Sequence, residues 1–148
     1  MNRLDAPPET LDDNPRLSTL MTRRLVAITP DAAAQVALQL MATTGVRHLP
    51  VMNGSTCLGM VLETDVVLAA AEGQLHRPGA PLTVDALCRR VAMLRAQDRR
   101  SIAAQLMCES EIDAVLIVED GNLIGIVTAT DLVRSLAGVA GAHRPGQK

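Results

Sequence analysis

The chain has 148 residues, which is enough for one compact domain but too few for two independent domains of ordinary size. It carries 14 basic and 16 acidic residues and no phenylalanine, tyrosine or tryptophan. Nucleic-acid-binding proteins usually present a basic surface or aromatic stacking platforms, so we expect no direct nucleic-acid partner. The core must be built from aliphatic side chains and methionine.

The cysteines and the N-terminal segment narrow the class of protein further. Cys57, Cys88 and Cys108 lack the spacing of a disulfide framework or a zinc site, so we expect reduced thiols and no metal. Residues 1–16 are rich in proline and acid without a signal-peptide pattern, and no apolar run is long enough to span a bilayer. These features predict a disordered tail over 1–16 and a soluble, cytoplasmic protein without a membrane partner.

The first half of the chain predicts an alternation of strands and helices. An apolar segment over 25–28 precedes Thr29-Pro30-Asp31, which has the cap, proline and acid of a helix start. Apolar residues then recur at helical spacing until Gly45, which is placed to end the helix. Strands over 47–52 and 58–62, joined by an Asn53-Gly54 turn, come next, and a second helix follows over 63–71.

The second half repeats this order after a linker over 73–83 that contains several glycines and prolines. Its predicted elements are a strand near Met93, a helix over 98–110, a strand over 113–118, an Asp120-Gly121 turn, a strand over 123–127 and a helix over 129–137. We expect the last residues, 138–148, to form a flexible tail.

The two halves are copies of one pattern. A shift of 67 residues superposes Leu49 on Leu116, and after the turn a shift of 66 superposes Asp65 on Asp131. This change predicts one extra residue in the first hairpin loop. The repeats cover 17–72 and 84–137, and two units too short to bury a core separately are expected to pack together.

The sequence Val-Arg-His-Leu-Pro-Val lies at 46–51. Two copies of the motif Gly-hydrophobic-hydrophobic-Thr-x-x-Asp come after it, an altered copy at Gly59 to Asp65 and an intact copy at Gly125 to Asp131. Together with the duplicated element order, these motifs resemble the cystathionine beta-synthase (CBS) domain pair, or Bateman module. The resemblance implies an α/β (α+β) fold of two tandem β-α-β-β-α repeats packed with pseudo-two-fold symmetry. It further implies a regulatory module that binds AMP, ADP, ATP or S-adenosylmethionine in a cleft between the repeats, and that often forms homodimers.

The second copy of the motif makes chemical sense as a ligand site. Asp131 is predicted in the first turn of a helix, where its carboxylate could accept two hydrogen bonds from a ribose cis-diol. Thr128 would direct a hydroxyl toward the same pocket, and the helix N-terminus could receive phosphate oxygens. The alternative interpretation is that Thr128 and Asp131 are ordinary helix caps.

The first repeat would complete that site, on the evidence of the resemblance. The positions carried over by the resemblance are Thr29, Ala34, Val46, Arg47 and His48, with main-chain groups near 46–48 contacting the adenine edge. Arg47 and His48 also lie where related modules often hold phosphates, a role that would serve the opposite cleft at Asp65. The alternative is a solvated arginine and a structural histidine.

The two predicted clefts differ. Leu62 stands where the second copy has Thr128, and Ala114-Val115 stands where the first has Arg47-His48. We therefore expect the Asp131 cleft to prefer an adenosine group with little phosphate. The cleft formed by Asp65, Asp113 and Ala114 should be weaker or empty.

No catalytic triad, metal-ligand set or phosphate-binding loop is visible, so we expect no enzyme activity and no required cofactor. A module without an attached effector domain would regulate an unknown partner protein in trans. The alternative function is a ligand-free dimerisation or interaction module. The apolar helix residues that could meet a second subunit, or instead complete the core, are Val66, Val67, Leu68, Leu132, Val133 and Leu136.

Overall fold

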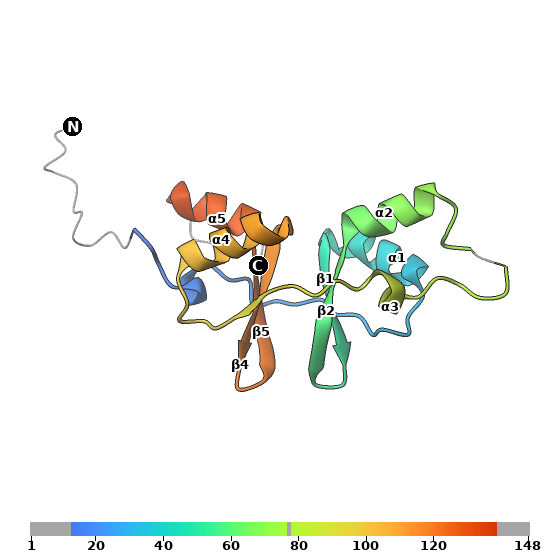
Figure 1. Cartoon of the computed structure of the whole chain (residues 1–148), viewed down its shortest axis with the longest axis horizontal. Helices are drawn as coiled ribbons and strands as arrows, with labels where there is room; N and C mark the ends of the chain where they lie inside the picture. The colour runs from blue at the N-terminus through green and yellow to red at the C-terminus, as the bar shows by residue number, and fades with distance from the viewer. Residues whose placement is uncertain (1–12, 77, 139–148) are drawn as a thin grey trace, which may run out of the picture.

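The computed structural model describes residues 13–76 and 78–138, and the elements lie in two lobes (Figure 1). The first repeat contributes η3 (Leu17–Thr19), α1 (Ala34–Thr44), β1 (His48–Asn53), β2 (Thr56–Leu62) and α2 (Glu63–Ala71). The second contributes α3 (Val84–Leu87), β3 (Met93–Leu94), α4 (Arg100–Ser110), β4 (Ala114–Glu119), β5 (Asn122–Thr128) and α5 (Ala129–Leu136). This is the mixed α and β architecture that the sequence predicted; the short helices η3 and α3 were not predicted.

The two β-hairpins lie side by side at the centre of the molecule, with helices beyond them on either side (Figure 1). β1 pairs antiparallel with β2, while β3, β4 and β5 form a three-stranded sheet. Aliphatic side chains from both hairpins share one buried cluster, whose central members are Met60, Leu62, Ala114, Leu116 and Ile126. This shared cluster joins the repeats, as expected for units that cannot bury a core separately.

The strand register corrects the predicted position of the one-residue difference between repeats. Equivalent hairpin positions are 66 residues apart throughout, from 48 and 114 at one end to 62 and 128 at the other, and both turns have two residues. The prediction of an extra residue in the first hairpin loop is therefore wrong. The difference lies upstream, because the bridge residues Thr22 and Arg89 are 67 apart whereas Ile28 and Leu94 are 66 apart.

The first helix of each repeat begins later than the sequence predicted. α1 begins at Ala34 and not near Asp31, because the Ala32 N–H donates to the Thr29 carbonyl and closes a turn first. Its N-cap, Ala33, makes no side-chain capping bond. The predicted end is correct, since Gly45 adopts φ +78° and its N–H donates to the Met41 carbonyl.

Residues 13–16, which were predicted as part of the N-terminal tail, contact the start of α4. The Asn14 Oδ1 atom accepts the Ser101 N–H at 2.9 Å, and the Pro15 carbonyl accepts the Arg100 N–H. These bonds satisfy amides in the first turn of α4 that would otherwise lack a partner within the helix. Residues 1–12 and 139–148, the rest of the predicted tails, lie outside the described residues.

Each lobe takes its first segment from the other repeat. Leu17 and Met21 are buried against β4 and β5, and Thr22 exchanges two backbone hydrogen bonds with Ile126. Conversely, Val84 packs in the core formed by α1, β1 and β2, and Arg89 bonds to the backbone of Met60 in the same way as Thr22 to Ile126. The repeats in the sequence are therefore not identical with the lobes in space.

The apolar residues of α2 and α5 were expected either to complete the core or to be available to a second subunit. One face of each helix packs on the core, and another face is exposed. Val66 is fully buried and Leu132 packs partly buried on the core of the second lobe. Val67, Leu68, Val133 and Leu136 remain 49%, 57%, 64% and 72% exposed. Within the described part of the chain, no helix has the length and apolar character needed to cross a membrane.

Candidate functional site

Thr128 and Asp131 form a reciprocal capping box at the start of α5. The Thr128 N–H donates to Asp131 Oδ2 at 3.0 Å, and the Asp131 N–H donates to Thr128 Oγ1 at 3.3 Å. The Thr128 hydroxyl also donates to Asp131 Oδ2 at 3.2 Å. The helix-cap interpretation of these residues is therefore correct for this structure, and it leaves a ligand role open.

The Asp131 carboxylate is fully buried, with 0% of its side chain exposed. Its Oδ1 atom lies 3.8 Å from Nη1 of Arg134, one turn later on the same helix. A buried carboxylate requires compensating hydrogen bonds or charge, which the capping box and Arg134 supply. A ligand that is to contact Asp131 must therefore displace part of what covers it.

Asp65 occupies the equivalent position at the start of α2 but has different partners. The N-cap of this helix is Leu62, which has no hydroxyl to cap with, as the sequence indicated. Asp65 instead receives two hydrogen bonds from Arg89: Nε donates to Oδ2 at 2.7 Å and Nη2 donates to Oδ1 at 2.8 Å. Hydrogen bonding and charge attraction to Asp65 raise the pKa of the Arg89 guanidinium above its ordinary value.

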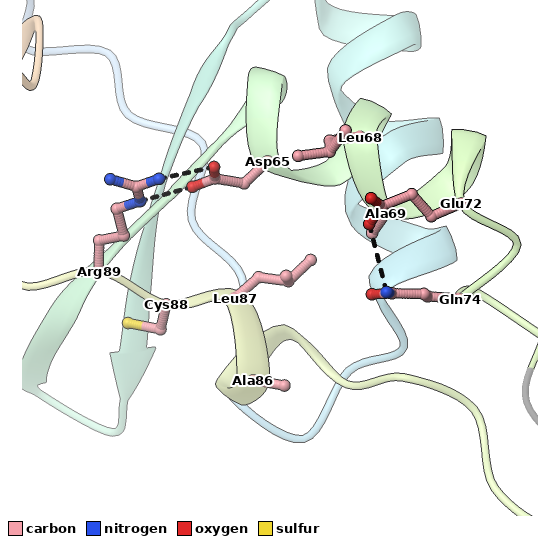
Figure 2. Close-up of a pocket in the computed structure, with 9 residues that line it drawn as sticks. All are labelled: Asp65, Leu68, Ala69, Glu72, Gln74, Ala86, Leu87, Cys88 and Arg89. Atoms are coloured by element: carbon pink, nitrogen blue, oxygen red, sulfur yellow. Dashed lines mark hydrogen bonds and ion pairs between the residues drawn. The ribbon is translucent and has the colours of Figure 1, made fainter.

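A cavity of about 280 Å³ lies between α2 and the segment that contains α3 (Figure 2). The Asp65–Arg89 pair stands at one end, and at the other end Gln74 Nε2 donates to Glu72 Oε1 at 3.2 Å. Apolar atoms line the space between, and the remaining lining residues are Leu68, Ala69, Ala86, Leu87 and Cys88. An apolar cavity with charged groups at its ends is suited to a small polar molecule.

His48 and Asp113 connect the two repeats. His48 Nε2 lies 2.9 Å from Asp113 Oδ1, and the histidine side chain is only 13% exposed. The structural interpretation of His48 is therefore realised here. Arg47 is 78% exposed with its Nε 3.8 Å from Glu63 Oε1, as expected for the solvated alternative.

The corrected register also changes which residues are equivalent across the clefts. The Arg47 carbonyl accepts the N–H of the first residue of α2, and the Asp113 carbonyl accepts the N–H of the first residue of α5. Arg47-His48 therefore corresponds to Asp113-Ala114, and the predicted equivalence with Ala114-Val115 is wrong. The second copy has an acid where the first has an arginine, so the charge difference between the clefts is larger than predicted.

The remaining predicted residues from the first repeat are engaged within the first lobe. Thr29 is exposed, and its carbonyl accepts the Ala32 N–H. Ala34 is fully buried, and its N–H donates to the Leu82 carbonyl at 2.7 Å. Val46 packs against the core of the same lobe. The structure thus brings together Thr128 with Asp131 and His48 with Asp113.

Sequence reasoning missed Arg89. The residue lies 24 positions after Asp65, beyond the linker, and meets it because the α3 segment packs on the first lobe. A strict 67-residue alignment of the segments before each helix would have paired Arg89 with Thr22 and exposed the difference between them. Among residues 13–76 and 78–138, no three His, Cys, Asp or Glu side chains gather closely enough to hold a metal ion.

One family model matches more than half of the chain. The model of the CBS domain matches residues 17–72 and 85–138. The CBS domain-containing protein YhcV of Bacillus subtilis is 28% identical over 113 residues, which cover 76% of this chain and 79% of YhcV. The inosine-5'-monophosphate dehydrogenase of Korarchaeum cryptofilum is 27% identical over 118 residues, and the matched region spans 79% of this chain but only 23% of the dehydrogenase.

Solved structures share the fold. CBSX2 in complex with AMP is 28% identical with a TM-score of 0.72, and the match covers 84% of this chain and 97% of CBSX2. The CBS domain pair of MJ0100, solved with 5-methylthioadenosine and S-adenosyl-L-methionine, has a TM-score of 0.71 at 18% identity, over 82% of this chain and 98% of that chain. The two repeats, their packing and these matches show that the chain belongs to the CBS domain family and carries a CBS pair of the Bateman type.

Proposed function

We propose that this CBS pair is a non-catalytic sensor that binds AMP, ADP, ATP or S-adenosylmethionine between its repeats and acts on a partner protein in trans. The observation that carries the proposal is the aspartate that each repeat places in the first turn of the helix after its hairpin, at 65 and 131. At this position the helix dipole stabilises the carboxylate, and a carboxylate can accept both hydroxyls of a ribose. The likeness to AMP-bound CBSX2, at 28% identity, supports this class of ligand.

The proposed site has Thr128 and Asp131 on the ribose and Thr29, Ala34, Val46, Arg47 and His48 around the base or phosphate. Because Asp131 is fully buried, ligand entry must be coupled to a local opening at the start of α5. The His48–Asp113 contact spans the repeats, so relative movement of the repeats would strain or break it. A ligand that binds only the opened form would shift the population toward that form, which gives the module a signal to transmit.

Titration calorimetry of the purified protein with AMP, ATP and S-adenosylmethionine tests the proposal. Asp131→Asn removes the negative charge but retains an oxygen that can cap α5, and Asp65→Asn is the matched variant in the other repeat. We expect binding to the wild-type chain that is lost in Asp131→Asn and retained in Asp65→Asn. Loss only in Asp65→Asn would move the site to the other cleft, and no binding to the wild-type chain would refute the sensor function.

The second candidate function is a ligand-free dimerisation or interaction module. It is favoured by the exposed apolar side chains of α2 and α5, which are Val67, Leu68, Val133 and Leu136. Such groups at neighbouring helical positions are suited to burial against a second copy of the chain. Sedimentation measures the association state, while thermal melting with the three ligands separates the functions, because a ligand specific for the folded state must raise the melting temperature.

A further inference from the structure

The first lobe places an arginine against its proposed ribose-binding acid, and the second lobe has a threonine at the equivalent backbone position. Arg89 and Thr22 hold equivalent places, since each exchanges two backbone hydrogen bonds with the residue after the motif glycine, Met60 or Ile126. In the first lobe this place carries a guanidinium, whereas in the second it carries a short hydroxyl side chain. The clefts are therefore unequal for a reason that lies outside the motif itself.

The backbone of Arg89 is held firmly beside the start of α2. The Met60 N–H donates to the Arg89 carbonyl at 2.9 Å, and the Arg89 N–H donates to the Met60 carbonyl at 2.8 Å. The approach is so close that a Cβ atom on Gly59 would lie 2.2 Å from the Arg89 carbonyl oxygen. From this fixed origin the side chain reaches across to Asp65 (Figure 2).

The contact engages both oxygens of the Asp65 carboxylate, at 2.7 and 2.8 Å. Such a two-pronged arrangement is the strongest geometry for an arginine and a carboxylate. A ribose cis-diol would approach a carboxylate in the same way, with one hydroxyl on each oxygen. The guanidinium and the diol are therefore competitors for one receptor.

The described contacts of Asp131 are of a different kind. Arg134 Nη1 lies 3.8 Å from Asp131 Oδ1 on the same helix, and the position equivalent to Arg134 on α2 is the apolar Leu68. The capping bonds of Asp131 come from Thr128 and converge on Oδ2. The described partners of the two acids therefore differ: the Arg89 guanidinium donates to both oxygens of Asp65, whereas Thr128 donates to Oδ2 of Asp131.

We propose that Arg89 is a specificity-determining residue that occupies the ribose-binding carboxylate of the Asp65 cleft and makes this CBS pair a one-site module. The proposal rests on the proposed adenosine-sensing function. It implies that Asp65 lies beside a cavity but is closed to a ribose by its ion pair with Arg89. Replacement of Arg89 by the residue of the other repeat should open it.

The test is the stoichiometry of binding in the full chain, measured by calorimetry with AMP, ATP and S-adenosylmethionine. Arg89→Thr installs the side chain found at Thr22, and Arg90→Thr removes the neighbouring exposed charge as a matched control. We expect a change from one ligand per chain to two in Arg89→Thr, and one ligand per chain in Arg90→Thr. The double variant Arg89→Thr, Asp131→Asn should keep the gained site and lose the original one.

Each outcome decides the inference. A folded Arg89→Thr variant with unchanged stoichiometry, or with weaker binding, would overturn it, and weaker binding would place Arg89 among the ligand contacts. Two ligands bound to the wild-type chain would also overturn it. If the wild-type chain binds no ligand and Arg89→Thr binds one, the role of Arg89 is supported and sensing at Asp131 is refuted. The two hypotheses can therefore fail separately. If Arg89→Thr does not fold, Arg89→Met, which keeps an unbranched side chain but removes the charge, must show the same gain.

Discussion

Replacement of Gly59 by alanine should destabilise the protein far more than the same change at Gly125. The two glycines are equivalent residues of the repeated motif, and both lie where the exchanged segment crosses the hairpin. The Cβ of Gly59→Ala would lie 2.2 Å from the Arg89 carbonyl oxygen, whereas that of Gly125→Ala would lie 2.7 Å from the Sδ atom of Met21 and 3.2 Å from the Thr22 carbonyl oxygen. Only the thioether can move aside without displacing backbone.

The magnitude follows from two terms. Gly59 has φ +151°, a conformation that L-residues rarely adopt, and such backbone strain costs about 1–3 kcal/mol. Displacement of Arg89 would also weaken the two backbone bonds to Met60, at about 1 kcal/mol each. We expect a loss of about 3–5 kcal/mol for Gly59→Ala, against about 1 kcal/mol for Gly125→Ala, where the flexible Met21 side chain can yield.

Urea unfolding followed by circular dichroism measures both free energies of unfolding. With a slope of about 1–3 kcal/mol per molar for a protein of this size, the two midpoints should differ on the order of 1–2 M. Equal destabilisation by the two substitutions would refute the reasoning, because it would mean that backbone and side-chain obstacles are equally costly here.

Three further predictions concern the cap, the exchanged segment and the buried thiols. Thr128→Ala should lower the free energy of unfolding by about 1 kcal/mol through loss of the capping box, while Thr128→Ser should preserve it, as urea midpoints would show; an equal loss in both variants would contradict the capping role. Met21→Ala should cost about 2–5 kcal/mol and accelerate amide hydrogen exchange in β4 and β5 more than in β1 and β2, because Met21 is buried in the core of the second lobe. Faster exchange mainly in β1 and β2 would argue against the segment exchange. Burial raises the pKa of the Cys57 and Cys88 thiols above the ordinary value of 9.0, so the unfolded chain ionises first and stability should fall as the pH rises through that value. The chain has no tyrosine and a single lysine, so few other side chains ionise in this pH range. The fall in stability, measured as the shift of the urea midpoint with pH, should be smaller in Cys57→Ala; an unchanged fall would exclude this thiol as its source.

The order of helices and strands was largely predictable because its signals are local. Gly45 ended α1 where expected, and the two turns separated the strands of each hairpin as expected. The helix start at 29–31 was mispredicted, because Thr29 accepts a turn hydrogen bond through its carbonyl before the helix begins. The position of the inserted residue was mispredicted because apolar residues in neighbouring strand positions resemble one another at either offset.

Part of the candidate site was also visible in the sequence. The spacing of Thr128 and Asp131 indicated either a cap or a ligand contact, and the structure realises the cap while burying the acid completely. The absence of a hydroxyl at Leu62 correctly marked the two repeats as unequal. The partner that Asp65 has in place of an N-cap hydroxyl is Arg89. This contact could not be predicted, because Arg89 reaches Asp65 only through the packing of the α3 segment.

The sequence by itself determined the duplication, the hairpins and the placement of one aspartate at the start of each motif helix, since turn residues and hydrophobic periodicity act over a few neighbouring positions. Only the tertiary structure decided that the first segment of each lobe comes from the other repeat. This arrangement places Arg89 against Asp65 and places Thr22 at the equivalent position of the second lobe. Contacts between distant segments depend on how whole surfaces pack, and no local pattern encodes them. The two equivalent aspartates of the duplicated motif therefore lie in different charge environments.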